Sequence, residues 1–212
     1  MNKALTVSVI LILFSFILGI YFYGIMPDKI ASHWNANGNA DGYLSKFWGL
    51  FLLPIISLGL FLLLLFIPRI DPKKENIKKF EKSYFNLILI TVIFMLYIYL
   101  LSILYNLNYN LNMTQWIIPG FSLLFFYIGI VLGKAKQNFT IGIRTSWTLS
   151  SEEIWDKTHK MSANLFKFSA IISLLGIFLP KYAIIFIIIP LIISALYSII
   201  YSYILFRRKK SR

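Results

Sequence analysis

Cysteine is absent from this 212-residue sequence, and acidic side chains and histidines are few. Without cysteine there is no disulfide scaffold, no thiolate metal site and no cysteine nucleophile. Eight acidic residues and two histidines leave little material for general acid–base chemistry. The motifs H-E-x-x-H, G-x-S-x-G and the phosphate-binding P-loop are also missing. We therefore expect a protein that is not an enzyme, with no catalytic residue, no cofactor and no resident metal.

What the sequence does contain is apolar. Hydrophobic residues make up 58% of the chain and charged residues 14%, whereas ordinary soluble domains have about 45–50% and about 25%. Mean hydropathy is +0.75. These values exclude a disordered chain and an ordinary soluble domain. They indicate a membrane protein, for which this length allows one domain or at most two.

Six stretches of the sequence are long and apolar enough to cross a bilayer, which takes about 20 residues. The first is longer than the apolar core of a signal peptide and no small-residue cleavage site follows it, so we interpret it as a retained helix. The fold class is therefore predicted to be all-α: a polytopic membrane protein with a bundle of six transmembrane helices. The predicted spans are 4–25, 47–67, 83–105, 115–133, 163–180 and 182–205.

The positive charges are distributed unevenly between the two sides of these spans. Of the 21 Lys and Arg residues, 17 fall at the N-terminus, in the 68–82 and 134–162 connections, or in the C-terminal tail with Arg212. Only Lys29, Lys46 and Lys181 fall on the opposite side, and Lys167 lies at the start of the fifth span. Basic residues are enriched in cytoplasmic loops, so both termini are predicted to be cytoplasmic. This bias explains the net charge of +13 without direct binding to DNA or RNA.

The outer loop, residues 26–46, is rich in turn-forming residues. Pro27 suits the first turn of a short helix, which would place Ile30 and Trp34 on one face. The segment 35–42 is a dense turn signal and resembles half of a calcium-binding loop, but Trp48 stands where the bidentate Glu is needed. We do not expect metal here. A structured turn that caps the bundle and an outward-facing recognition surface both remain open as interpretations.

The 139–162 segment on the cytoplasmic side is the second informative loop. Ser150 and Glu153 have the spacing of a capping box, which predicts a helix that continues into the fifth span. Glu153 and Lys157 form a favourable i,i+4 pair, as do Asp156 and Lys160.

Two further features of this segment have a plain interpretation. Glu152, Asp156 and His159 share one helix face and resemble a metal site in residue type, but a linear run on one helix is typical of a solvated face. Trp147 and Trp155 favour a position at headgroup depth.

The predicted spans contain no Asp, Glu or His. Ion-coupled transporters usually keep such groups inside the membrane, so a small-solute transporter or permease is the alternative rather than the first interpretation. Pro190 is the one proline in mid-span and predicts a kink. Gly129 and Gly133 form a G-x-x-x-G pattern that permits close helix packing, either inside the bundle or between two copies.

At the two informative loops the sequence resembles known families. The outer motif, Pro27-Asp28-Lys29-Ile30 followed by His33-Trp34-Asn35-Ala36-Asn37-Gly38 and Asp41-Gly42, resembles a bacterial membrane domain of unknown function. The second motif resembles the signature of the SdpI family, with Ser146 where the family pattern has Pro. Its matching residues are Gly142, Ile143, Arg144, Thr145, Trp147, Thr148, Leu149, Glu152, Glu153, Trp155, Thr158 and His159.

The resemblance implies a function and a division of the chain. SdpI-family proteins are membrane immunity proteins against a secreted, sporulation-delaying toxin peptide, and some also act as receptors that hold a small cytoplasmic transcriptional repressor at the membrane. The implied division is an N-terminal membrane domain, 1–110, and an SdpI-like domain, 111–212. The partners implied are the lipid bilayer, the toxin peptide and such a repressor, while the oligomeric state stays open.

From this resemblance we derive two sets of site residues. The toxin-binding set is His33, Trp34, Asn35, Asn37, Asp41 and Gly42. The cytoplasmic partner-binding set is Gly142, Arg144, Thr145, Trp147, Thr148, Glu152, Glu153, Trp155 and His159.

The charge bias makes a topology prediction. A reporter that is active only in the cytoplasm should be active when fused after Arg212, and one inserted near Asn39 should be active only outside. An external C-terminus would mean an odd number of spans and would contradict both loop assignments.

Overall fold

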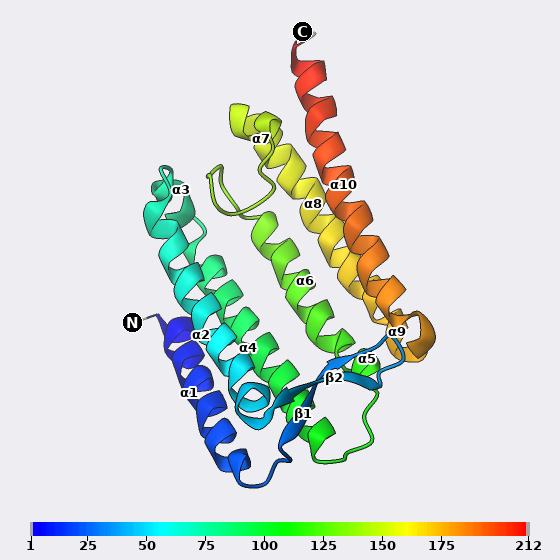
Figure 1. Cartoon of the computed structure of the whole chain (residues 1–212). Helices are drawn as coiled ribbons and strands as arrows, with labels where there is room; N and C mark the ends of the chain where they lie inside the picture. Colours follow the sequence, from blue (N-terminus) through cyan, green and yellow to red (C-terminus); the bar gives the residue numbers. More distant parts are fainter. Residues whose placement is uncertain (1, 211–212) are drawn as a thin grey trace.

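The computed structural model describes residues 2–210 and is a bundle of long helices with one β-hairpin at one end (Figure 1). Arg212, counted above in the basic tail, lies outside the described residues. The elements in chain order are α1 Lys3–Tyr23, β1 Lys29–Trp34, β2 Ala40–Ser45, α2 Lys46–Ile70, α3 Lys74–Lys78, α4 Glu81–Asn106, α5 Met113–Trp116, α6 Ile118–Leu132, α7 Ser146–Ser150, α8 Glu152–Ser173, α9 Leu175–Phe178, a 3₁₀ turn Pro180–Tyr182, and α10 Ala183–Lys210.

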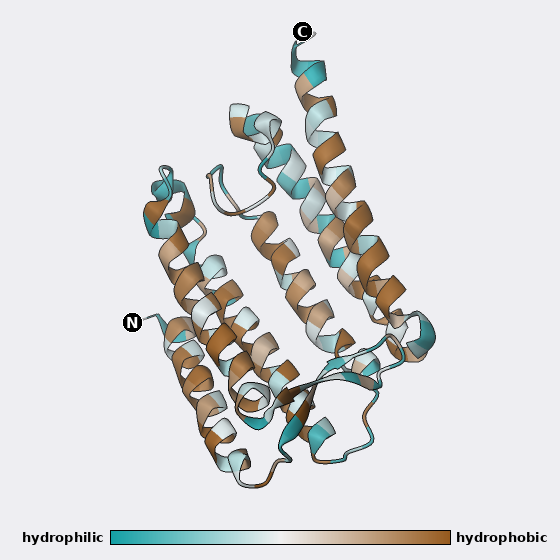
Figure 2. Ribbon diagram, viewed as in Figure 1, coloured by the Kyte–Doolittle hydropathy of each residue, from teal (hydrophilic) through white to brown (hydrophobic). Residues whose placement is uncertain are grey.

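The six predicted spans are confirmed as helices within residues 2–210. Each is long and apolar enough to cross a membrane, with α5 and α6 together forming the fourth, Met113–Leu132. The predicted boundary between the fifth and sixth spans, at residues 180–182, is present as the 3₁₀ turn between α9 and α10. In Figure 2 the apolar residues run along the helices, while polar residues gather at the two ends and in the first turns of α8.

The distribution of small and large side chains on these helices is the reverse of that in a soluble bundle: small residues face the other helices and large apolar residues face outward. On α1 the buried positions are mostly small: Ala4, Ser8, Ile12, Ser15 and Gly19. Ile17 and Ile20 on the opposite face are more than 60% exposed. Large side chains are as well solvated by lipid as by protein, so helices in a membrane associate through small and hydroxyl residues.

The helices form two groups of three. In the first, α1, α2 and α4 pack on one another; in the second, α8 packs on both α6 and α10. The contact between α4 and α6 joins the groups. The division near residue 110 falls in the connection between α4 and α5, and the assignment of two domains stays a prediction.

Close approach of α6 and α8 depends on the G-x-x-x-G pattern. A Cβ at Gly129 would lie 2.8 Å from the carbonyl oxygen of Ala163, and one at Gly133 would lie 3.3 Å from the Cβ of Ala163. The pattern therefore serves packing inside this chain.

Hydroxyl groups connect α8 and α10 along their length. Ser162 donates a hydrogen bond to Ser198 at 2.7 Å, and the Ser169 and Ser194 hydroxyls are 2.8 Å apart. Ser169 also donates to the carbonyl oxygen of Pro190 at 3.0 Å. Hydrogen bonds between transmembrane helices contribute on the order of 0.6 kcal/mol each.

The short helix predicted after Pro27 is wrong, because the outer loop folds as a hairpin. Lys29–Trp34 pairs antiparallel with Ala40–Ser45. The turn between them is closed by Asn35, whose side chain accepts the N–H groups of Asn37 and Asn39, and by Gly38 at φ +82°. A helix of six or seven residues is marginal by itself, whereas the hairpin satisfies its backbone groups across the strands.

Candidate functional site

The hairpin is held rigidly against the helix ends. Asn106, at the end of α4, accepts the Ala31 N–H at 2.8 Å and donates to the Ala31 carbonyl at 3.1 Å, so one side chain replaces a missing strand partner. The Tyr105 hydroxyl accepts the Ala40 N–H at 3.2 Å. On the other face Ile30 is buried against Gly49 of α2, where a Cβ would leave no room for it.

Two residues of the predicted toxin-binding set face outward on this support. His33 Nδ1 lies 2.5 Å from a carboxylate oxygen of Asp41, and their side chains are 74% and 43% exposed. They belong to adjacent strands, where His33 is paired with Gly42. A Cβ at Gly42 would lie 2.9 Å from the Cβ of His33, so glycine leaves space for the imidazole. This pair is accessible to a ligand.

The other members of that set support the hairpin. Trp34 is half-buried and packs edge-on against Tyr105, with ring centroids 5.5 Å apart. Asn35 closes the turn, and its carbonyl accepts a hydrogen bond from Thr114. The Asn37 carbonyl accepts one from Asn112. Toxin binding by these residues stays a prediction.

Beside the hairpin lies a polar cleft of about 420 Å³ that sequence reasoning missed. The Asn106–Thr114 connection carries no charge, so charge patterning gives no sign of a site there. The available signal was its density of asparagine, whose side chain both donates and accepts hydrogen bonds. The lining consists of Asn37, Gly38, Asn39, Tyr105, Asn108, Tyr109, Asn110, Leu111 and Asn112.

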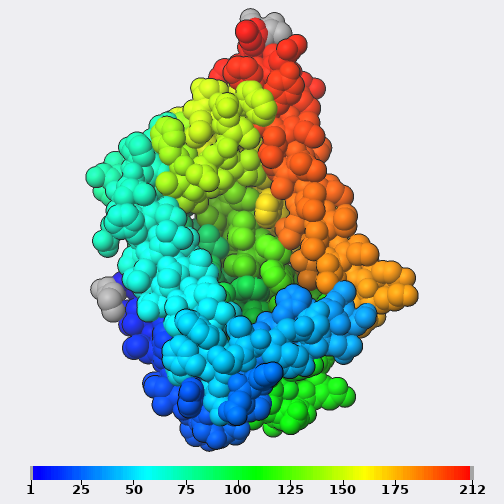
Figure 3. All heavy atoms as spheres, viewed as in Figure 1, coloured from blue at the N-terminus to red at the C-terminus, as the bar shows by residue number. Residues whose placement is uncertain are grey.

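Figure 3 shows a recess on the face of the bundle above the hairpin. Part of α6 lies at its floor, with α2 on one side and α10 on the other. The hairpin closes one end of the recess and the 139–150 segment lies at the other.

At the opposite end of the bundle, the second motif, residues 142–159, forms a compact knot around His159. Its Nδ1–H donates to the Trp155 carbonyl at 2.9 Å, and its Nε2 accepts the Ile143 N–H at 3.0 Å. The imidazole stacks on the Trp155 ring with centroids 3.9 Å apart. Because Nε2 is an acceptor, the imidazole is neutral.

Gly142 makes this knot possible. It has φ +118°, and a Cβ there would collide with His159 Nε2. The Trp155 indole N–H donates to the Ala135 carbonyl at 2.8 Å, which ties the knot to the end of α6. The prediction of a solvated His159 is therefore wrong, since its side chain is buried, and Trp155 is buried beside it.

The helix start predicted at Ser150 is displaced. Thr145 and Thr148 form the capping box, which begins the short α7. Ser151, not Ser150, caps α8 and accepts the Ile154 N–H. The spacing of Ser150 and Glu153 could not reveal this, because Ser150 and Ser151 both offer a hydroxyl. It also gave no sign of the short helix α7 that precedes α8.

The ion pairs of α8 only partly follow the predicted order. Glu153 pairs with Lys157 at 2.7 Å as expected, and also with Lys209 of α10 at 3.3 Å. Asp156 pairs with Lys136 at 3.5 Å. Within residues 2–210 no three His, Asp or Glu side chains come together as a metal-ligand group.

The partner-binding set divides into buried and outward-facing residues. Gly142, Trp155 and His159 build the knot, and the Thr145 hydroxyl lies 3.1 Å from that of Ser202 on α10. Four other members lie at the surface: Arg144, Glu152 and Glu153 are exposed, and Trp147 is half-buried beside Tyr203. Thr148 is buried.

A buried carboxylate, Asp71, joins the 68–82 loop to the 139–145 loop. Asp71 is 3% exposed. It accepts hydrogen bonds from the Lys73 N–H, the Phe139 N–H and the Thr140 hydroxyl, at 2.7, 2.9 and 2.6 Å. It thereby holds the 139–145 loop, and with it Arg144, against the first group of helices.

Comparison with known proteins agrees with the two motifs. Residues 134–202 match the SdpI/YfhL protein family, and residues 10–58 match a domain of unknown function, DUF1648. The Immunity protein SdpI of Bacillus subtilis (strain 168) is 27% identical over 198 residues, which cover 93% of each chain. No solved structure matches.

The knot makes a stability prediction. His159→Phe keeps the stacking on Trp155 but leaves the Ile143 N–H without its acceptor, so the free energy of unfolding should fall by about 1–3 kcal/mol. Thermal unfolding of the detergent-purified protein, followed by tryptophan fluorescence, measures this.

His33→Phe is the matched control. It removes the exposed hydrogen bond to Asp41 and should change stability by about 1 kcal/mol or less. Equal melting temperatures for His159→Phe and wild type would contradict a structural role for the knot.

Proposed function

We propose that this chain, as a member of the SdpI/YfhL family, is a membrane immunity protein. It protects its cell by binding a secreted, membrane-active peptide. The alignment that covers 93% of both this chain and the immunity protein carries the proposal. Since the alignment covers both the hairpin half and the motif half, the likeness concerns the whole arrangement rather than one loop.

The hairpin end of the bundle carries aromatic and polar side chains suited to contact with such a peptide. A membrane-active peptide concentrates at the bilayer surface, where aromatic side chains are favoured. Tyr43, Phe47 and Trp48 are about half exposed or more around the hairpin. The His33–Asp41 pair supplies polar contacts beside them, and the recess in Figure 3 leads from the hairpin along the helices. This surface supports recognition of an amphipathic chain.

Binding rather than catalysis fits the arrangement of the titratable groups. Both ring nitrogens of His159 are engaged by backbone groups. His33 lies at the opposite end of the bundle. A shared acid–base site is therefore not assembled from the two histidines, and protection would follow from holding the peptide away from the lipid.

Protection of sensitive cells tests the proposal. Cells that express the chain should survive a sporulation-delaying toxin peptide that kills cells carrying an empty vector. His33→Ala/Asp41→Ala should lower the tolerated peptide concentration at least tenfold, which corresponds to about 1.4 kcal/mol of binding, at unchanged membrane abundance.

Asp28→Ala/Lys46→Ala is the control, because it removes a different polar contact, the 3.1 Å ion pair at the base of the same hairpin. It should protect like wild type. If wild type gives no protection, the immunity function is wrong; if the His33/Asp41 variant protects fully, the hairpin is scaffold.

We further propose that the 139–162 segment presents a surface to a small cytoplasmic repressor. Arg144 is exposed although its guanidinium donates to the Phe139 carbonyl at 2.7 Å, so the loop holds it in one place. Glu152 is exposed and Trp147 half-exposed nearby in sequence. α8 runs from this surface through the membrane. Peptide binding would therefore change recruitment of the repressor only if the peptide binds more tightly to one position of α8 than to another.

Recruitment of a labelled regulator to membranes, with and without peptide, tests this output. Arg144→Ala/Trp147→Ala should abolish recruitment and spare protection. Lys160→Ala, an exposed change on the same segment, should have no effect. Normal recruitment by the double variant would show that these residues serve structure alone.

A further inference from the structure

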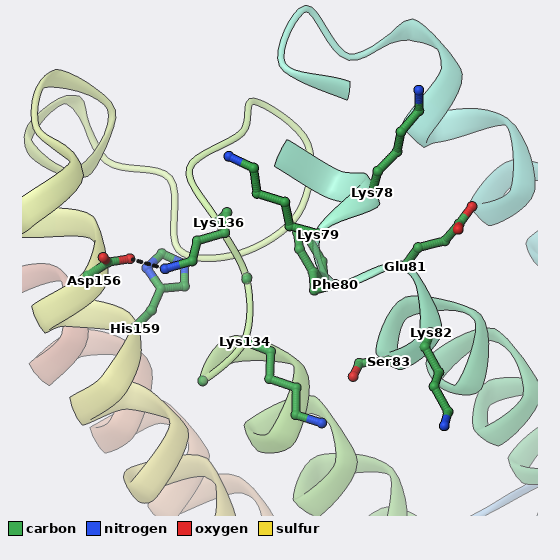
Figure 4. A pocket seen from close by; sticks show the side chains of 12 residues that line it. Lys78, Lys79, Phe80, Glu81, Lys82, Ser83, Lys134, Lys136, Asp156 and His159 are labelled. Carbon is green, nitrogen blue, oxygen red and sulfur yellow. Dashed lines mark ion pairs between the residues drawn. The ribbon is translucent and has the colours of Figure 1, made fainter. Parts of the chain in front are cut away.

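A basic cleft lies at the cytoplasmic end of the bundle, between the corner of α3 and α4 on one side and α6 and α8 on the other. It has a volume of about 610 Å³. Five lysines line it against two carboxylates, Glu81 and Asp156 (Figure 4). The lysines are Lys78, Lys79, Lys82, Lys134 and Lys136.

The positive charge of the cleft is only partly compensated. Asp156 is paired with Lys136 at 3.5 Å, and Lys78 with Glu75 at 2.8 Å outside the cleft. Its hydrogen bond to Glu75 raises the pKa of Lys78, so this ammonium is charged at neutral pH. No carboxylate within residues 2–210 forms an ion pair with Lys82 or Lys134.

The helix that opens into the cleft adds to this field. Glu81, Lys82 and Ser83 are the first residues of α4, a helix of 26 residues. Phe80 at its N-cap offers no side-chain acceptor. The N-terminus of a helix carries partial positive charge and favours an anion, so the dipole and the lysines act in the same direction.

The depth of the cleft indicates where its ligand comes from. The fourth span, Met113–Leu132, has 20 residues, which rise about 30 Å and match the hydrocarbon thickness. The next residues, Gly133 and Lys134, already line the cleft. The cleft therefore begins where the hydrocarbon ends, at the level of lipid phosphates.

An apolar surface adjoins it. A second cleft of about 310 Å³ shares Lys78 and Glu81 with the first. Its walls include Leu65, Pro68 and Phe85. A ligand with a charged head and an apolar tail could therefore contact lysines and apolar side chains at the same corner.

We propose that the lysine cleft binds the phosphate of an anionic phospholipid of the inner leaflet. Lys78, Lys79 and Lys82 belong to the first group of helices, and Lys134 and Lys136 follow α6 of the second. In Figure 4, Lys82 and Lys134 extend to the same side of the cleft. The bound phosphate bridges the two groups, so the lipid stabilises their association.

The test uses the full chain purified in neutral detergent. Thermal unfolding is followed while phosphatidylglycerol, phosphatidylcholine, inorganic phosphate or a polyglutamate peptide is added. Phosphatidylglycerol should raise the melting temperature, whereas phosphatidylcholine should not. Lys82→Gln/Lys134→Gln should weaken the response to phosphatidylglycerol at least tenfold in the concentration required.

Lys160→Gln/Lys210→Gln is the matched control, since it removes the same charge at the same end but outside the cleft. It should respond like wild type. Should the double cleft variant not fold, Lys82→Gln and Lys134→Gln are measured singly, and each should weaken the response.

Three results would overturn the proposal. Equal stabilisation by the two lipids would show that no anion is recognised. An unchanged response of the cleft variants would place the lipid elsewhere. Stabilisation by inorganic phosphate or polyglutamate at concentrations where phosphatidylglycerol has no effect would identify a soluble phosphate or an acidic protein segment as the ligand.

Discussion

Small and hydroxyl side chains between helices hold this protein together, because in a bilayer large apolar side chains gain nothing by leaving lipid. The serine contacts between α8 and α10 and the approach of Gly129 to Ala163 are the clearest cases. They fix α8 against both neighbours. Since α8 also carries Trp155 and His159, the knot around His159 depends on this packing for its position.

At the two ends, where helices stop, single polar side chains take over this role. Asn106 satisfies both backbone groups of Ala31, and Asp71 gathers two N–H groups and one hydroxyl. An unpaired backbone group near the membrane is costly, so each such side chain fixes a whole loop. The hairpin and the 139–145 loop are consequently rigid surfaces, suited to recognition by preformed shape.

The two ends differ in the chemistry that they present. The hairpin end is almost neutral and rich in amides and aromatic side chains, as in the asparagine-lined cleft. The other end is strongly basic, with lysines from both helix groups around one cleft. A surface rich in amides and aromatic side chains suits a peptide at the membrane surface, and a basic one suits an anionic leaflet.

The sequence by itself determined the six spans, the break at Pro180 and the concentration of charge at one end, because hydropathy and charge are local properties. It also carried the family motifs, although not the roles of their residues. Tertiary structure alone decided that His159 is buried, since this requires the space left by Gly142, 17 residues earlier. Likewise Asp71 meets Thr140 across 69 residues, and Asn106 meets Ala31 across 75. Burial of a polar side chain depends on which distant partner satisfies it, and that partner is known only once the helices are packed.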